Sequence, residues 1–420
     1  MALLKRVVVF VEHFPPFLGS DRTIYELASR AAKNGTKVHF IAIQPLRYLL
    51  GKRPEHWSYK ENWKSTPKTA HPNITSEYLV LNPYVESMWK RFPPVAYLLT
   101  VLLFSFSAIR SILRFQPQIA VAAHASLLLG VVSFLSSKIA FKPLFMGCPD
   151  WMSAYAASLV DEKMSRMGPV LLQLIEIILY KLSNGIFAVT HFLKRLLVEN
   201  GVLNTRIVVI PNGVDVDVFT PHVDTQAIRE KYRLGNRCVI LFTGHLEAWA
   251  GVSVIYDLAV RLDKDYPESV ILLVGSGDPT KELFSKLVNK NLGYIVVHAG
   301  LHPFEDMPAF TAASDIALCL FPNTPVSHAA SPLKLFEYMA AGKAVVATAV
   351  TGTVEVMDNS IGCLVKPGNA NALCDAVIDL CKNQSKRLEI GEAARKRVEE
   401  KYSWDQLSLI FVRECERLLN

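Results

Sequence analysis

Short apolar runs alternate with longer amphipathic segments through the second half of the chain, and this alternation constrains the fold most. The expected strands are 238–243, 270–274, 294–299 and 316–320. The expected helices are 252–262, 281–290, 304–313, 370–383 and 385–401. Apolar strands separated by helices pair in parallel, with helices on both faces of the sheet. The pattern therefore predicts a doubly wound α/β domain that binds its ligand at the carboxyl ends of the strands.

The start of the chain has the same layout. Residues 7–11 and 37–43 are expected strands, and the helix between them ends near Asn34-Gly35. Gly19 stands at the entrance of that helix, although the G-x-G-x-x-G fingerprint of dinucleotide-binding domains is absent. A strand, loop, helix and strand in this order predict a second nucleotide-binding-like α/β domain.

Composition and charge narrow the class of protein. The chain has 420 residues, 51% of them hydrophobic and 20% charged, which suits two globular domains. Seven cysteines without a C-x-x-C pair favour reduced thiols over a disulfide framework or a zinc site. Residues 1–205 carry a net charge of +11 and the remainder −4. A basic half favours anionic lipid or phosphorylated substrates, and nucleic acid is not expected because no binding motif accompanies the charge.

Residues 92–109 form an uncharged run of eighteen residues, which reaches the length of a transmembrane helix. Pro93-Pro94 and several Ser and Thr residues weaken that interpretation, so a buried or interfacial helix is favoured over a span. A second apolar helix is expected at 170–182, in the core or on a membrane. No signal peptide is recognisable at the start of the sequence.

The stretch 327–353 reads as a loop, a short helix, a glycine stop, a strand and a turn. Ser331 is the expected N-cap of the helix and Gly342 its end. A helix N-terminus with Lys334 in its first turn suits a diphosphate, and Glu337 one turn later suits a pair of sugar hydroxyls. The stretch predicts a nucleotide diphosphate site, with an ordinary capped helix packed on a sheet as the alternative.

Several motifs occur along the chain in a fixed order. They are PPFLGSDRTIYELASRAAKNGTKVHFIA, FMGCPDWMSAY, VVIPNGVDVDVFTP, LLVGSGD, HAGLHPFEDMPAFTAASDIAL, SPLKLFEYMAAGKAVVAT and EKYSWDQL. With this set the chain resembles the GT-B retaining glycosyltransferases of the glycosyltransferase-4 (group 1) family over nearly its whole length. The segment 208–221 resembles the interdomain signature of that family. The first half resembles members that assemble cell-surface glycans on lipid carriers.

The resemblance implies two doubly wound Rossmann-like domains that face each other across a cleft. Residues 1–205 would bind the acceptor and residues 206–400 the nucleotide sugar. The C-terminal helix, 401–420, would pack back on the N-terminal domain. We expect closure of the cleft to exclude water that would hydrolyse the donor.

The resemblance also assigns roles to single residues. The expected catalytic residues are His124, beside the transferred sugar, and Lys334 and Glu337 at the diphosphate and the ribose. The expected donor-binding residues are Gly19, His245, Gly275, Gly277, Phe304, Ser331, Leu333, Lys334 and Glu337, with the 302–304 loop near the nucleobase. As simple turn residues, Gly275 and Gly277 have an equally good structural explanation.

The sequence departs from the family pattern at three positions. His245 stands where the family has an arginine, Ala250 where it has a lysine, and Ala329 where it has the first of two paired glutamates. Asp215 and Asp217 have the D-x-D form of a metal site, but within the interdomain signature the first Asp belongs to a turn. We therefore expect neither a metal nor another cofactor.

The predicted function is retaining transfer of a sugar from a nucleotide diphosphate to a hydroxyl of a glycan or lipid-linked acceptor. Because the first half is basic and apolar, an anionic membrane surface is a candidate partner. The expected location is cytoplasmic and peripheral at the inner membrane face. A soluble acceptor, a sugar-nucleotide epimerase or phosphorylase, a non-catalytic scaffold and an integral membrane protein stay open as alternatives.

Overall fold

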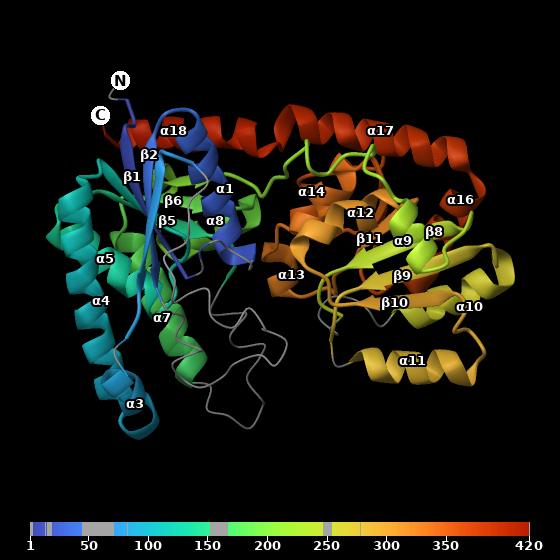
Figure 1. Cartoon of the computed structure of the whole chain (residues 1–420), viewed down its shortest axis with the longest axis horizontal. Helices are drawn as coiled ribbons and strands as arrows, with labels where there is room; N and C mark the ends of the chain where they lie inside the picture. The colour runs from blue at the N-terminus through green and yellow to red at the C-terminus, as the bar shows by residue number, and fades with distance from the viewer. Residues whose placement is uncertain are drawn as a thin grey trace. The chain divides into compact units, whose positions relative to one another are not determined.

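The computed structural model describes residues 3–12, 14, 19–43, 71–81, 83–151, 167–246, 254–277 and 279–419. The chain divides into two compact units, shown in Figure 1. Unit 1 comprises Met1–Pro211 with Trp404–Asn420, and unit 2 comprises Asn212–Ser403. Each unit contains its own parallel sheet covered by helices. The predicted class of two doubly wound α/β domains is therefore confirmed.

Unit 1 is built on a seven-stranded sheet in the order β3-β2-β1-β4-β5-β6-β7. Its strands are β1 (Arg6–Val11), β2 (Lys37–Ile43), β3 (Ile74–Leu79), β4 (Ile119–Ala122), β5 (Leu144–Cys148), β6 (Gly185–Ala188) and β7 (Ile207–Val209). Its helices are α1 (Gly19–Lys33), α3 (Pro83–Arg91), α4 (Pro93–Phe115), α5 (Leu129–Ile139), α7 (Met167–Leu182), α8 (His191–Glu199) and α18 (Trp404–Leu418). All neighbouring strands are parallel, and the order reverses between β1 and β4. Ligands of such sheets bind at the carboxyl ends of the strands at this switch point.

Unit 2 is built on a six-stranded parallel sheet in the order β10-β9-β8-β11-β12-β13. Its strands are β8 (Cys238–Thr243), β9 (Ser269–Val274), β10 (Val296–Gly300), β11 (Ile316–Cys319), β12 (Ala344–Thr348) and β13 (Cys363–Val365). Its helices are α9 (Gln226–Lys231), α10 (Ile255–Asp265), α11 (Pro279–Asn289), α12 (Met307–Ala312), α13 (Pro325–Ala329), α14 (Leu333–Ala340), α15 (Thr351–Val354), α16 (Ala370–Lys382) and α17 (Gln384–Lys401). The switch point lies between β8 and β11, so β8 should carry functional groups at its carboxyl end.

The boundaries of the units differ by a few residues from the predicted 205/206 and 400/401 divisions. Residues 207–209 form β7, which pairs with β6 in unit 1. The backbone N–H of Ile210 still donates to the carbonyl of Ala188, so the chain leaves unit 1 only after this bond. At the other end α17 continues to Lys401, and the chain enters unit 1 again at Trp404.

Helix α18 covers unit 1 by packing on α1. The Ser408 hydroxyl donates to the carbonyl of Leu27 at 2.9 Å. The ring of Phe411 is fully buried, and its centroid lies 5.3 Å from that of Phe187 in β6. The last segment of the chain therefore completes the core of the first unit.

The apolar run at 92–109 lies in α4 except for Phe92, which precedes the helix, and α4 is long and apolar enough to cross a membrane. Among the described residues it is the one helix of that kind. One side of the helix is nevertheless buried against α5 and against the strands β2 and β3. The helix thus contributes to the core of unit 1.

Replacing Phe411 with Ala should destabilise unit 1, because the change empties a closely packed site at the centre of the contact between α18 and the sheet. Phe-to-Ala changes in cores cost about 3–5 kcal/mol. Denaturant unfolding of the full chain measures the loss. Leu409→Ala, on the exposed side of the same helix, should change stability by less than about 0.5 kcal/mol. Equal losses for the two variants would contradict the packing of α18.

Candidate functional site

Helix α14 is attached to the end of strand β8 by two side chains four residues apart. The Lys334 Nζ donates to the carbonyl of Thr243 at 3.1 Å. The backbone N–H of Thr243 donates to the Tyr338 hydroxyl at 2.9 Å, and the Thr243 hydroxyl lies 2.8 Å from the same oxygen. Residues four apart share one face of a helix. The N-terminal end of α14 is thus fixed at the carboxyl end of β8, which is the switch point of the sheet.

The Lys334 ammonium group lies between two aromatic rings. Its Nζ is 4.2 Å from the ring centroid of Phe242 and 5.7 Å from that of Phe321, which follows β11. Cation–π contacts of this kind contribute about 0.5–2 kcal/mol each. Loss of hydration nevertheless lowers the pKa of Lys334 below its usual value, and the nearby Cys319 and Glu337 oppose that change. An ammonium group has three donors and Thr243 takes one, so the arrangement suits an anionic ligand.

The turn after β8 is shaped by two glycines with positive φ angles. Gly244 has φ +106°, and the carboxyl end of β9 continues into Gly275 with φ +140°. A Cβ atom on Gly275 would lie 1.8 Å from the carbonyl oxygen of Gly244, so only glycine fits. The structural explanation of Gly275 is therefore sufficient without a ligand, and Gly277, two residues further on, is half-buried.

Ser331 does not cap α14 as predicted. Pro332 occupies the N-cap position, and no side chain caps the helix there. The Ser331 hydroxyl oxygen instead accepts from the backbone N–H of Asn212 at 3.3 Å, and the Asn212 side chain donates to the Ser331 carbonyl at 2.5 Å. Asn212 lies in the predicted interdomain signature, so this signature supports the loop in front of α14. The predicted end of the helix at Gly342 is confirmed by its φ of +66° and its bond to the Met339 carbonyl.

The loop expected near the nucleobase is held by aromatic and acidic neighbours. The His302 Nε2 lies 2.9 Å from the Tyr232 hydroxyl, and its Nδ1 lies 2.8 Å from the Asp306 carboxylate. The Phe304 ring packs on the Phe219 ring, with 5.7 Å between the ring centroids. These contacts fix the loop within unit 2, and its proposed role at the base stays a prediction.

The region around Ala329 contains an ordered histidine in place of the missing glutamate. The His328 Nδ1 accepts from the backbone N–H of Thr351 at 3.2 Å, and its Nε2 lies 2.8 Å from the Asn323 amide oxygen. Since Nδ1 accepts a hydrogen bond from this N–H, Nε2 carries the proton when the ring is neutral. Helices α13 and α15 are joined through this ring.

The remaining predicted donor residues are placed as follows. Leu333 and Glu337 lie in α14 and are half-buried, and His245 is exposed in the turn after β8. Gly19 is the first residue of α1 in unit 1. Ala250 lies outside the described residues.

Unit 1 contains a second cluster of ionisable groups at its own switch point. His124 follows β4 and is buried, and its Nε2 lies 3.6 Å from the Asp21 carboxylate and 3.9 Å from that of Glu12. Glu12 follows β1 directly, and its carboxylate accepts from the Ser126 hydroxyl at 3.3 Å. The His124 Nδ1 is buried and has no hydrogen-bond partner among the described residues. A bound substrate can satisfy such an atom.

Asp150 belongs to the same cluster. Burial is the largest effect on its pKa, which is raised to about 7. His124 acts to lower this pKa, and the buried Glu176 acts to raise it. Cys148 at the end of β5 and Tyr180 on α7 are buried nearby, and burial raises the pKa of each. Perturbed groups at a switch point are typical of functional sites.

Sequence reasoning found part of each cluster. It identified Lys334, Glu337 and His124, but missed Phe242, Phe321 and the carboxylates of Glu12 and Asp21. Glu12 could have been found from its position immediately after an apolar strand.

The described residues offer no group of three or more His, Cys, Asp or Glu side chains arranged to hold a metal ion. The Asp215 carboxylate of the D-x-D sequence accepts from the backbone N–H groups of Asp217 and Val218 at 3.2 and 3.3 Å. It therefore forms a turn. Independence from metals stays a prediction.

The fold and the switch-point clusters define a two-domain α/β protein of the nucleotide-binding type. Residues 224–397 match the sequence model of "Glycosyl transferases group 1", and residues 18–218 match that of "Glycosyltransferase Family 4". The two models together cover the chain from 18 to 397 apart from 219–223. The chain belongs to this family of GT-B glycosyltransferases.

Curated relatives are similar over part of their length. An uncharacterized glycosyltransferase of Methanocaldococcus jannaschii is 28% identical over 244 residues, which are 58% of this chain and 61% of the relative. The GDP-mannose-dependent alpha-(1-6)-phosphatidylinositol monomannoside mannosyltransferase of Mycolicibacterium smegmatis is 28% identical over 202 residues, 46% of this chain and 52% of the relative. The chain thus spans between one half and about three fifths of these relatives.

Solved structures of other proteins are similar in fold to nearly the whole of this chain. Anabaena Alr3699/HepE in complex with UDP and glucose superposes with a TM-score of 0.71 at 19% identity, covering 98% of this chain and 99% of that one. Sucrose-phosphate synthase from Thermosynechococcus elongatus has the same TM-score at 16% identity and covers 99% of each chain. At these identities the likeness shows the fold.

Lys334→Met should weaken binding of a nucleoside diphosphate about 10- to 100-fold, because a charge-assisted hydrogen bond contributes about 1.5–3 kcal/mol. Titration calorimetry measures the change. Lys343→Met is the matched control in unit 2: Lys343 is also desolvated, which lowers its pKa to about 8, and its Nζ donates to the Ala312 carbonyl at 2.7 Å. The control should lose stability and keep its affinity. Equal affinities of the Lys334 variant and the unchanged protein would contradict the site.

Asp150→Asn should change how stability depends on pH. The folded pKa of Asp150 is raised to about 7, so the folded state holds a proton that the unfolded state releases near pH 4. The free energy of unfolding contributed by this group therefore falls as pH rises from about 4 to about 7. Thermal unfolding at several pH values should show the variant equal to the unchanged protein near pH 4 and more stable by about 1 kcal/mol or more at pH 8.

The unchanged protein, measured at the same pH values, is the reference for this variant. A constant offset between the Asp150 variant and the unchanged protein at every pH would contradict the raised pKa.

Proposed function

We propose that this protein transfers a sugar from a nucleotide diphosphate to a hydroxyl group of an acceptor, with retention of the anomeric configuration. Unit 2 binds the donor, and unit 1 contributes the acceptor site and His124. The observation that carries the proposal is the desolvated Lys334 ammonium at the switch point of the unit 2 sheet, in a chain that belongs to a glycosyltransferase family.

Lys334 and the start of α14 supply the charge for the leaving group. In the reaction the bond from the anomeric carbon to the diphosphate breaks, and the acceptor oxygen forms its bond to that carbon on the same face. The acceptor proton passes to the departing phosphate oxygen, so no protein base is required. A fixed cation and fixed N–H dipoles stabilise the charge that develops on the diphosphate. In this proposal Glu337, one turn further along α14, accepts hydrogen bonds from the ribose hydroxyls.

We propose that His124 lies beside the transferred sugar. Its Nε2 faces the carboxylates of Asp21 and Glu12, and its Nδ1 offers a further polar contact.

The acceptor in this proposal is a glycan or a lipid-linked molecule at the cytoplasmic membrane face. Two observations support it: the net charge of +11 in residues 1–205, and the similarity to a mannosyltransferase whose name specifies a phosphatidylinositol acceptor. The protein itself would be peripheral.

A thermal-shift screen with UDP, GDP, ADP and their sugars tests donor binding. The nucleotides that carry one of the three bases should raise the unfolding temperature of unit 2 by about 5–10 °C. This holds at a nucleotide concentration about a hundredfold above the dissociation constant. Glu337→Ala should lose most of that stabilisation. If no nucleotide stabilises the protein, the scaffold alternative replaces this proposal.

The stereochemical claim needs the reaction product. With the donor that binds, proton NMR of the new linkage should show the anomeric configuration of the donor sugar. Inversion would contradict retention. Isomerisation of the donor without an acceptor would favour an epimerase.

A further inference from the structure

Helix α4 in unit 1 exposes an apolar stripe along its full length. Its buried side faces α5 and the sheet. The other side carries large apolar side chains that are between 46% and 70% exposed, namely Val95, Leu98, Leu102, Leu103, Phe106 and Leu113. Apart from the adjacent Leu102 and Leu103, successive members are three, four or seven residues apart, which places them along one side of the helix. We call these six side chains the α4 stripe.

The stripe lies at the rim of unit 1. In Figure 1 α4 is the outermost helix on its side of the unit, with α3 at one end. Phe92, between α3 and α4, is 53% exposed, and Phe141, which follows α5, is 93% exposed. Such a large exposed apolar surface usually marks an interaction site.

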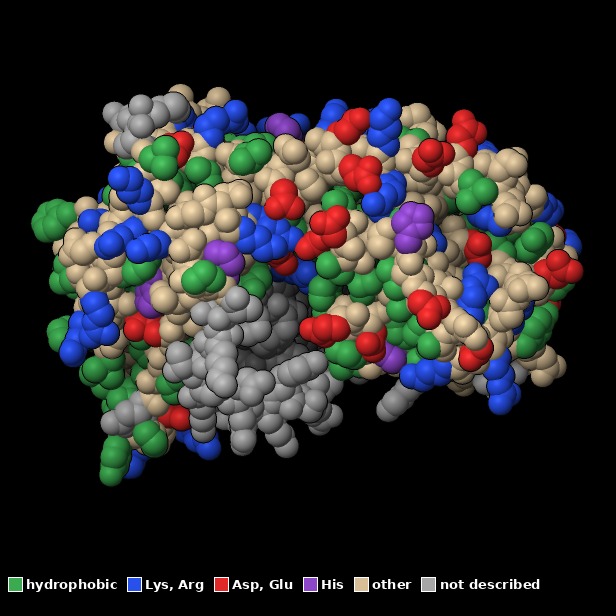
Figure 2. Space-filling view, turned by 45° about the horizontal axis from the view of Figure 1, so that its top comes forward, with side chains coloured by type: hydrophobic (Ala, Val, Ile, Leu, Met, Phe, Trp, Pro, Cys, Tyr) green, Lys and Arg blue, Asp and Glu red, His purple; other side chains and the backbone are tan. Residues whose placement is uncertain are grey.

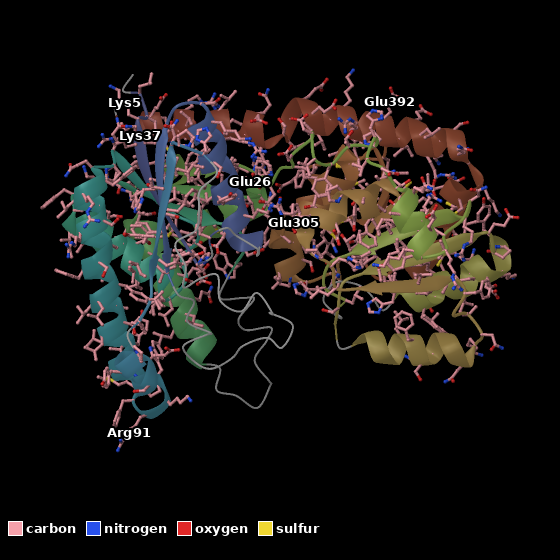
Figure 3. The ribbon with its side chains drawn as sticks, in the orientation of Figure 1. Lys5, Glu26, Lys37, Arg91, Glu305 and Glu392 are labelled. Atoms are coloured by element: carbon pink, nitrogen blue, oxygen red, sulfur yellow. The ribbon has the colours of Figure 1, made fainter. Side chains whose placement is uncertain are left out.

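The charged residues in the sequence around the stripe are basic. From residue 87 to residue 149 the sequence contains no Asp or Glu, and its Lys and Arg residues are Lys90, Arg91, Arg110, Arg114, Lys138 and Lys142. Arg91 extends away from the unit at the end of α3 in Figure 3. The left side of Figure 2 shows hydrophobic and basic side chains, with some acidic and histidine side chains between them. Among the described residues, Glu86 in α3 and Glu77 in β3 are acidic neighbours of this region, and Glu77 lies near Arg114.

The charge pattern distinguishes between the occupants that an apolar stripe could have. A second copy docking through a twofold axis would bring these cations against the same cations of its partner, which is repulsive. A bilayer with anionic headgroups offers apolar chains for the stripe and opposite charge for the Lys and Arg residues. The pattern therefore favours the bilayer.

The packing of α4 in unit 1 also indicates how the helix would be oriented relative to a bilayer. Its buried side includes Thr100, Ser105 and Ser111, and it is fixed on α5 and the sheet. To cross a bilayer the helix would have to leave this core and expose these hydroxyl groups to lipid. The geometry therefore suits a helix that lies in the plane of the interface with only its stripe inserted.

We propose that unit 1 docks on an anionic bilayer through the α4 stripe and its flanking Lys and Arg residues, with α4 parallel to the membrane plane. This inference rests on the proposed function, since a lipid-linked acceptor would be presented at the same surface. Docking holds the acceptor-binding unit at the membrane without a spanning segment.

Vesicle co-sedimentation tests the docking surface on the full chain. The unchanged protein should bind vesicles of phosphatidylcholine with 30% phosphatidylglycerol and bind pure phosphatidylcholine at least tenfold more weakly. The double variant Leu102→Glu, Phe106→Glu should bind the anionic vesicles at least tenfold more weakly than the unchanged protein. Leu409→Glu is the matched control, because Leu102 and Leu409 are both 56% exposed and α18 packs on α1. Wild-type binding by the double variant would overturn the proposal.

A charge variant separates docking from misfolding. Arg110→Gln with Arg114→Gln should reduce binding to anionic vesicles and flatten its salt dependence, whereas Arg413→Gln, in α18, should not. If light scattering shows a dimer that only the stripe variants dissociate, the occupant is a second copy and the proposal is wrong. Resistance of the protein to extraction from membranes at alkaline pH would likewise overturn the in-plane orientation.

Nucleotide binding distinguishes failure of this inference from failure of the proposed function. Each stripe variant should keep the stabilisation by the nucleoside diphosphate, because its changes lie in unit 1 and on the surface. Lost vesicle binding with intact nucleotide binding in the stripe variants supports the inference. A protein that binds nucleotide but no vesicles refutes the docking surface alone, and one that binds vesicles but no nucleotide refutes the donor site alone.

Discussion

The bonds that Lys334 and Tyr338 make to Thr243 determine the chemistry available to unit 2. One side chain donates to the carbonyl of the last residue of β8, and the other accepts from its N–H. Both come from the same face of α14, so the helix, the strand end and the cation are fixed together. The strand continues into Gly244, and the close approach of Gly275 to that residue follows from the same turn. In the proposed function this rigid cation beside a helix N-terminus binds the diphosphate.

Both units place ionisable groups where their sheets change direction. In unit 2 the group is Lys334, with a pKa lowered by burial. In unit 1 it is His124 with the Asp21 and Glu12 carboxylates, near Asp150, whose pKa burial raises to about 7. Burying an ionisable group destabilises a folded domain. Proteins retain such buried groups where function requires them. This shared feature supports a functional role for each cluster and explains why they occur at corresponding positions in the two sheets.

The sequence predicted most of the fold because strands and helices have different apolar periods. The bounds of β2 and β8 agree residue for residue, since both are apolar runs between polar turns. Local patterns also found Lys334 and the end of α14 at Gly342. The capping role of Ser331 was wrong because Asn212, 119 residues away, binds its hydroxyl. The aromatic rings around Lys334 and the carboxylates beside His124 were missed for the same reason: strand pairing, rather than local sequence, brings them together.

The central claim is that Lys334 binds the diphosphate of a sugar nucleotide at the carboxyl end of β8. A crystal structure of the full chain with the nucleoside diphosphate that binds best tests it most directly. The account predicts a phosphate oxygen within hydrogen-bond distance of the Lys334 Nζ, about 2.7–2.9 Å for such a charged pair. It also predicts that the ribose hydroxyls contact Glu337. A nucleotide bound elsewhere, with Lys334 still enclosed by Phe242, Phe321 and Thr243 alone, would contradict it.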